Sequence, residues 1–223
     1  MKSTQPMKTF QALGALISYP TGALIEALPD VHAVIVEEGL VDRTRRGAIK
    51  DLMHELEAAD LLDLEEQYVG LFDRGRATAL HLFEHVHGDS RDRGQAMVDL
   101  HQVYAAGGFE LGPRELPDYL PAMLEFLSHR PLEEAREMLR DCAHILRSIG
   151  CALRERGSAY AVVFDALLVA VGEDGLGAAI DSIPSDETDI DVLWAEAPAF
   201  GPASGNASCS AAASGRGCTP PAA

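Results

Sequence analysis

An apolar repeat of about 3.6 residues runs through this chain and limits the folds that it can adopt. Large apolar side chains recur at intervals of three and four, which places them on one face of an α-helix. The clearest stripes are Phe10, Leu13, Leu16 and Ile17, then Ile49, Leu52, Met53 and Leu56, and then Leu61, Leu64, Tyr68, Leu71 and Phe72. The alternating pattern typical of strands is nowhere sustained, so the sequence predicts an all-α protein.

The second half of the chain predicts further helices. The spacing returns in Met97, Leu100 and Tyr104, and in Met123, Leu124 and Leu127. The longest helix is expected from about Pro131 to Arg156, because acidic residues stand near its start, arginines near its end and Gly157 just beyond it. One more helix is expected to carry Tyr160, Phe164, Leu167, Leu168 and Val171 on its inner face and to end at Gly172.

Composition predicts one domain followed by a tail. With 47% apolar residues in 223, the chain can bury a core of ordinary size. In residues 197–223, 21 of 27 residues are Ala, Gly, Ser or Pro, which leaves little apolar surface to offset the entropy of ordering. We therefore expect a single-domain helical bundle over residues 1–196 and a disordered tail over residues 197–223.

The charge balance limits the partners of this protein. Its 35 acidic and 18 basic residues give a formal charge of -17, which repels nucleic acid and anionic lipid and favours a basic peptide as partner. The chain has no apolar stretch near the roughly 20 residues needed to span a bilayer, and its start lacks a convincing cleavage site. We expect a cytoplasmic protein without direct membrane insertion. Its four cysteines are spaced unlike a zinc knuckle or a redox dithiol.

Polar residues concentrate between Tyr68 and Gly94. There His81, Glu84 and His85 spell the H-x-x-E-H pattern, in which two histidines share a zinc ion and the glutamate activates water. A zinc-dependent hydrolase is therefore the alternative function. The pattern is short enough to arise by chance, and no third ligand stands out, so we expect no metal site. The tripeptide Asp-Arg-Gly occurs at residues 73–75 and again at residues 92–94, which is interpreted as a coincidence at two helix boundaries.

Other catalytic patterns are missing from the sequence. There is no G-x-S-x-G elbow for a serine nucleophile, and no glycine-rich phosphate loop of the G-x-G-x-x-G or Walker type. We therefore expect no catalytic residues, no bound cofactor and no enzymatic activity.

The segment from Glu115 to Pro121, ELPDYLP, predicts a stiff bend before a helix. Its two prolines disfavour helical geometry at the residues before them, and the second suits a helix start. The bend would fix Asp118 and Tyr119 in space. A carboxylate beside an aromatic ring suits a peptide that carries a guanidinium and an apolar side chain, although Asp118 could equally cap the helix.

At these two segments the chain resembles the respiratory nitrate reductase assembly chaperones of the delta-subunit or NarJ type. That family belongs to the redox-enzyme maturation chaperones, which include the TorD and DmsD proteins. The resemblance rests on YVGLFDRGRATALHLFEHVHGDSRDRGQAMVDL from Tyr68 to Leu100 and on ELPDYLPAMLEFL from Glu115 to Leu127. TFQALGALISYP near the start adds to it, and in all it covers residues 8–194.

The resemblance implies a TorD-like, all-helical chaperone that is not part of the finished enzyme. It implies binding to the N-terminal leader-like peptide of the catalytic alpha subunit during iron-sulfur and molybdenum cofactor insertion, before membrane docking. Proteins of molybdenum cofactor biosynthesis are further expected partners. The matching motifs assign the peptide groove to Glu115, Leu116, Pro117, Asp118, Tyr119 and Pro121, with Phe83, Glu84 and His85 as a second group.

Overall fold

The computed structural model describes residues 7–86, 92–112 and 115–177. All of them belong to the first of two units into which the chain divides, Met1–Ala179 and Ile180–Ala223. The expected domain boundary at residue 196 and the expected tail therefore lie outside the described residues. Cys209 and Cys218 lie outside them too.

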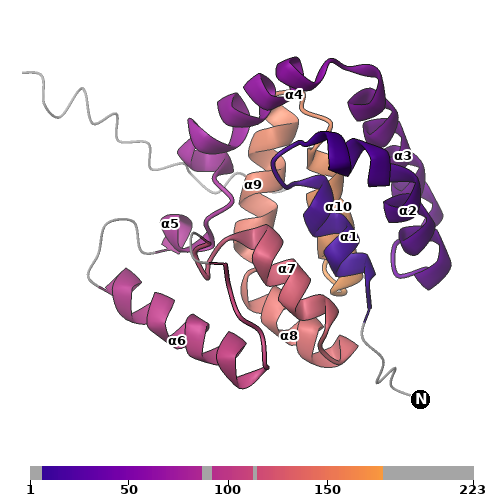
Figure 1. Ribbon diagram of the computed structural model, residues 1–223. Helices are drawn as coiled ribbons and strands as arrows, with labels where there is room; N and C mark the ends of the chain where they lie inside the picture. The colour runs from indigo at the N-terminus through magenta and orange to yellow at the C-terminus, as the bar shows by residue number, and fades with distance from the viewer. Residues whose placement is uncertain (1–6, 87–91, 113–114, 178–223) are drawn as a thin grey trace, which may run out of the picture. The chain divides into compact units, whose positions relative to one another are not determined.

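Helices account for the regular structure of the described residues, and the all-α prediction is confirmed (Figure 1). Their order is α1 Thr9–Leu16, α2 Gly22–Glu38, α3 Arg43–Ala58, α4 Leu61–Tyr68, α5 Leu82–Val86, α6 Asp92–Ala106, α7 Leu120–Ser128, α8 Leu132–Asp141, α9 Ala143–Glu155 and α10 Ala161–Ala170. A π-helical turn, Val69–Asp73, and a 3₁₀ turn, Arg76–Thr78, join α4 to α5. In the described part of the chain, strand-like pairing is confined to one isolated bridge between His81 and Tyr119.

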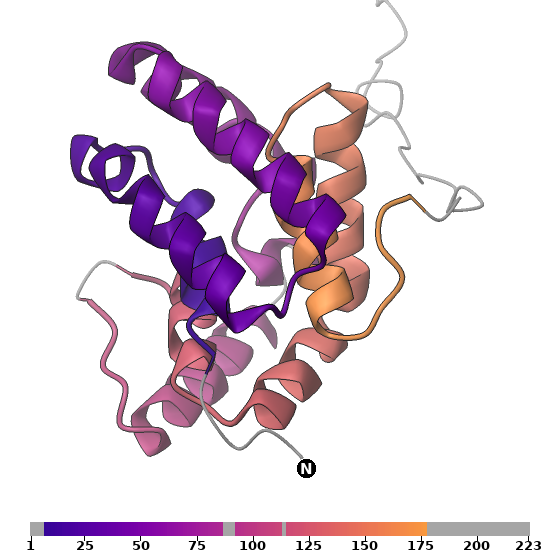
Figure 2. The same ribbon diagram turned by 90° about the vertical axis from the view of Figure 1, so that its right-hand side faces the viewer.

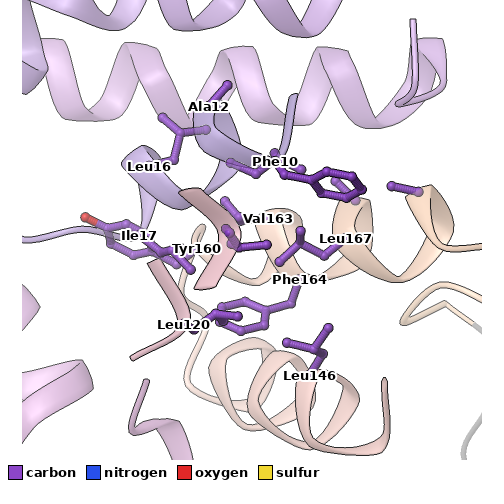
Figure 3. Close-up of a cluster of buried hydrophobic side chains, with 14 of the residues drawn as sticks. Phe10, Ala12, Leu16, Ile17, Leu120, Leu146, Tyr160, Val163, Phe164 and Leu167 are labelled. Atoms are coloured by element: carbon purple, nitrogen blue, oxygen red, sulfur yellow. The ribbon is translucent and has the colours of Figure 1, made fainter. Parts of the chain in front are cut away.

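The core forms where α1 packs against α7, α2 and α10, and where α9 packs along α10. Figure 3 shows Phe10, Leu16 and Ile17 of the first segment gathered with Phe164 and Leu167 of α10. All five side chains are at most 1% exposed. The predicted apolar stripes therefore meet one another in a single cluster, and their burial is the main stabilising contribution to the fold.

Helix α2 runs beside α3 and was not assigned from the sequence (Figure 2). It contains Pro29, which cannot donate a backbone hydrogen bond inside a helix. Only Leu28 and Ile35 of its 17 residues are buried, so its apolar stripe is thin. Thr21 caps its start by accepting a hydrogen bond from the Leu24 N–H, and Gly39 ends it at a φ of 63°.

The single long helix expected over residues 131–156 is wrong, because the chain forms two helices that break at Cys142. Cys142 has a φ of -97° and a ψ of 2°, and its N–H donates to the Leu139 carbonyl at 3.2 Å in place of a regular i-4 partner. One non-helical residue leaves the apolar spacing almost undisturbed, so the pattern reads as continuous. The expected ends are confirmed at Gly157 and Gly172, whose φ values of 68° and 87° suit glycine.

The most apolar helix, α10, has 10 residues and therefore a length of roughly 15 Å, about half of a bilayer's hydrocarbon thickness. None of the helices in the described ranges is both long and apolar enough to cross a membrane.

Candidate functional site

The two motifs singled out in the sequence are joined by backbone pairing. His81 and Tyr119 form an antiparallel bridge. The Leu82 N–H donates to the Asp118 carbonyl at 3.0 Å, and the Leu120 N–H donates to the Leu80 carbonyl at 2.9 Å. Residues 80–86 and 115–121 therefore form one structural unit, although α6 lies between them in the chain.

Asp118 is the central residue of this unit, and it has no exposed surface. Its carboxylate accepts a hydrogen bond from the Phe83 N–H at 3.2 Å and lies 3.3 Å from Nδ1 of His81. The Arg93 guanidinium lies 3.9 Å away. The hydrogen bond to Asp118 raises the pKa of His81 above its ordinary value, and partial burial opposes this shift. The carboxylate thus ties α5 and the start of α6 to the bend before α7.

Two tyrosines, Tyr104 and Tyr68, form hydrogen bonds with the bend at residues 115–121. The Tyr104 hydroxyl of α6 donates to the Pro117 carbonyl at 2.7 Å in a buried contact. The hydroxyls of Tyr119 and Tyr68 lie 3.1 Å apart, and Tyr68 donates its proton to the Ile17 carbonyl at 3.0 Å. Tyr119 is therefore the donor to Tyr68. Burial raises the pKa of all three phenols, so they stay neutral donors at physiological pH.

The nine residues predicted for the peptide groove differ widely in exposure. Glu115 and Leu116 are exposed, and Leu116 has 45% of its surface accessible. The partly exposed residues are Phe83, Glu84, His85 and Tyr119, and the buried ones are Pro117, Asp118 and Pro121. All nine residues belong to the bridged unit of residues 80–86 and 115–121. Only the exposed and partly exposed ones can contact a partner without rearrangement.

Exposed apolar side chains occur within the same unit and on α6, which connects its two segments. Of seven large exposed apolar residues in the described ranges, four come from α5, α6 and the segment before α7: Val86, Val98, Val103 and Leu116. Helix α6 is anchored at its start by the Arg93–Glu84 ion pair and near its end by the Tyr104–Pro117 bond. Tyr104 is its one buried residue and Leu100 packs partly against the core, so much of the remaining apolar surface of α6 is available to a partner.

The H-x-x-E-H pattern does not form the helical pair of histidines that zinc enzymes use. Helix α5 begins at Leu82, so His81 precedes it. The His81 ring contacts Asp118, and Nε2 of His85 donates to the Ala79 carbonyl at 2.9 Å. Within the described residues, no group of three His, Cys, Asp or Glu side chains could hold a metal ion.

A cavity of about 580 Å³ opens beside this unit. Its charged lining residues are Arg74, Arg76, Arg93, His81, Asp73 and Glu84. Arg74 and Arg93 are the middle residues of the two Asp-Arg-Gly tripeptides, which were interpreted as a coincidence. The shared tripeptide was the available signal in the sequence, but only the fold shows that the first copy and Arg93 of the second line one cavity.

Comparison with known proteins identifies the relatives of this chain. The family model described as nitrate reductase delta subunit matches residues 38–166. The chain is 43% identical over 187 residues to the nitrate reductase molybdenum cofactor assembly chaperone NarJ of Escherichia coli (strain K12), covering 81% of this chain and 79% of that protein. A NarJ protein of Bacillus subtilis (strain 168) is 33% identical, with 81% and 97% covered.

The fold is also that of a solved structure. A protein from Archaeoglobus fulgidus described as a redox enzyme maturation protein superimposes with a TM-score of 0.52 at 22% identity. The match covers 72% of this chain and 91% of that one. The expectation of an all-α helical bundle is therefore confirmed.

Proposed function

This chain belongs to the nitrate reductase delta-subunit family, a family of assembly chaperones rather than of catalytic enzymes, and we propose that it binds the N-terminal leader-like segment of the apo catalytic alpha subunit of a nitrate reductase. In this proposal it holds the subunit in the cytoplasm while the molybdenum cofactor and iron-sulfur clusters are inserted. Membrane docking is delayed until the segment is released. Proteins of molybdenum cofactor biosynthesis are further proposed partners.

The observation that carries the proposal is the backbone bridge between His81 and Tyr119. It joins the two most distinctive motifs of the chain into one unit and presents exposed apolar side chains beside exposed carboxylates. An amphipathic peptide helix binds through apolar side chains one turn apart, and its basic residues would pair with an acidic rim. The formal charge of -17 favours the approach of such a basic peptide.

The nine site residues divide into two proposed roles. Leu116 contacts the apolar face of the peptide and Glu115 pairs with one of its basic residues, together with the partly exposed Tyr119, Phe83, Glu84 and His85. Pro117, Asp118 and Pro121 are buried and act by positioning the others. The guanidinium 3.9 Å from Asp118 belongs to this chain's own Arg93, so Asp118 supports the site without requiring a partner's arginine.

Holding the segment is sufficient to order assembly. A chaperone and a membrane partner that compete for one peptide cannot bind it together, so docking waits until the chaperone lets go. Release follows when the client folds around its cofactors and its leader binds the folded client more tightly than it binds the chaperone. This mechanism needs no nucleotide hydrolysis.

The test is titration calorimetry of the full chain with a synthetic leader peptide. Leu116→Ser and Glu115→Gln should each weaken binding, with a loss of about fivefold or more for Leu116→Ser. Leu62→Ser is the matched control, because Leu62 is 73% exposed and lies on α4, away from the site. Equal affinities for Leu116→Ser and the wild-type chain would contradict the proposed site.

The competing functions give different results. A zinc-dependent hydrolase would purify with about one zinc per chain and lose activity in Glu84→Gln. A permanent structural subunit would purify with the mature membrane enzyme, whereas the proposed chaperone should be recovered with cofactor-free alpha subunit only.

A further inference from the structure

The cavity beside the bridged unit is lined by several arginines in a protein that is strongly acidic as a whole. Three guanidinium groups line it, from Arg74 and Arg76 before α5 and from Arg93 on α6. Two carboxylates, Asp73 and Glu84, share the lining. The lining arginines outnumber the lining carboxylates by one, and the buried Asp118 carboxylate, 3.9 Å from Arg93, adds a third acid behind the lining.

The partners of the three arginines differ. Arg93 lies 3.4 Å from the Glu84 carboxylate, and Arg76 donates to the Glu84 backbone carbonyl at 3.4 Å. Arg74 makes no ion pair or side-chain hydrogen bond with any residue that the structure describes. Glu84 and the buried Asp118, 3.9 Å away, therefore neutralise Arg93, while the donors of Arg74 and most of those of Arg76 remain available to a ligand.

The loop that carries Arg74 and Arg76 is anchored to the core. Thr78 has no exposed surface, and its hydroxyl donates to the Leu71 carbonyl. Arg156, at the end of α9, donates to the same hydroxyl at 2.7 Å. A Cβ atom at Gly75 would lie 2.9 Å from this oxygen, so the tight turn requires glycine. The two arginines thus extend from a fixed turn, which lowers the entropy lost when a ligand binds.

The size and donors of the cavity define a ligand class. About 580 Å³ lies within the usual range for small-molecule sites. One guanidinium can pair with both oxygens of a carboxylate. A phosphate group has enough oxygens to accept hydrogen bonds from several guanidinium groups at once. Distant acidic residues repel such a ligand only weakly, because charges more than about 8 Å away are screened at physiological ionic strength.

We propose that the cavity lined by Arg74, Arg76 and Arg93 binds a small molecule through a phosphate or diphosphate group. This site is distinct from the peptide surface around Leu116, although Glu84 borders both. The protein would therefore hold two ligands of opposite charge, a basic peptide and a phosphorylated small molecule.

Titration of the full chain with inorganic diphosphate, followed by calorimetry and by NMR shifts of arginine side chains, tests the proposal. Saturable binding is expected, and the double variant Arg74→Gln/Arg76→Gln should weaken it about tenfold or more. Arg43→Gln is the matched control, since Arg43 is exposed at the start of α3 and does not line the cavity. Arg93 is left intact because its ion pair anchors α6.

Three results would overturn the proposal. They are no saturable binding of diphosphate at millimolar concentration, the same affinity in the double variant, and equal affinity for citrate, which would assign the cavity to carboxylates. An unchanged unfolding midpoint in the double variant shows that the loss of binding does not reflect misfolding. Leader-peptide affinity is measured in the same samples, and its retention separates this site from the peptide surface.

Discussion

The carboxylate of Asp118 lies 3.3 Å from Nδ1 of His81, although 37 residues separate the two in the chain. The same carboxylate accepts the Phe83 N–H and faces Arg93. One buried acid thus connects the loop before α5, the start of α6 and the bend before α7. This connection sets how the exposed residues of the site are presented.

Replacing Asp118 by Asn should destabilise the protein by about 1–3 kcal/mol, because a buried charge-assisted interaction with His81 and Arg93 is lost. The amide oxygen can still accept the Phe83 N–H, so the fold should persist. Urea unfolding measures the change. Glu115→Gln, an exposed carboxylate of the same segment, should shift stability by less than about 0.5 kcal/mol. Equal effects of the two substitutions would contradict the central position of Asp118.

The His81–Asp118 contact should make stability depend on pH. The pKa of His81 is raised above its ordinary value of 6.5, chiefly by the hydrogen bond to Asp118. The folded state therefore holds the proton more tightly than the unfolded chain does. The contribution of the His81–Asp118 contact to the free energy of unfolding is complete below pH 6.5. It is lost as the pH rises through the pKa of His81 in the folded state. Histidine NMR titration should give a midpoint above 6.5 for His81 that falls in Asp118→Asn.

Thr78→Val should destabilise the protein by about 1–3 kcal/mol, because it leaves the Leu71 carbonyl and an Arg156 donor without their buried partner. Thr78→Ser keeps the hydroxyl and is the control, with a smaller loss expected. Urea unfolding of both variants gives the comparison. If Thr78→Val is as stable as the wild-type chain, the hydrogen bonds of the hydroxyl do not contribute to stability.

Gly150→Ala should destabilise by about 1–3 kcal/mol despite the higher helix propensity of alanine. An added Cβ would lie 2.7 Å from Cδ1 of Leu176 and 2.9 Å from Cβ of Phe164, where α9 meets α10. At Gly47, inside α3, an added Cβ meets nothing within 4 Å, so Gly47→Ala should stabilise by about 0.5–1 kcal/mol. Thermal unfolding should therefore move in opposite directions for the two variants.

Helix assignments from the sequence succeeded where one strong apolar stripe faces the core, as in α1, α3 and α10. They failed in α2, where Pro29 and a stripe of two buried residues obscure the period. They also failed at Cys142, since a break of one residue changes the helix direction but not the spacing. The candidate site was predicted from its motifs and stays a prediction, and the different exposures of Asp118 and Leu116 were not foreseen.

The helical class, the acidic charge and the family could all be read from the chain, because each is a property of local spacing, composition or motif. The burial of Asp118 against His81, and the shared cavity of Arg74 and Arg93, became visible only once the helices were packed. An apolar period reports which side chains share a helix face within a few turns. Contacts between segments depend on how several helices pack together, and no local pattern encodes that.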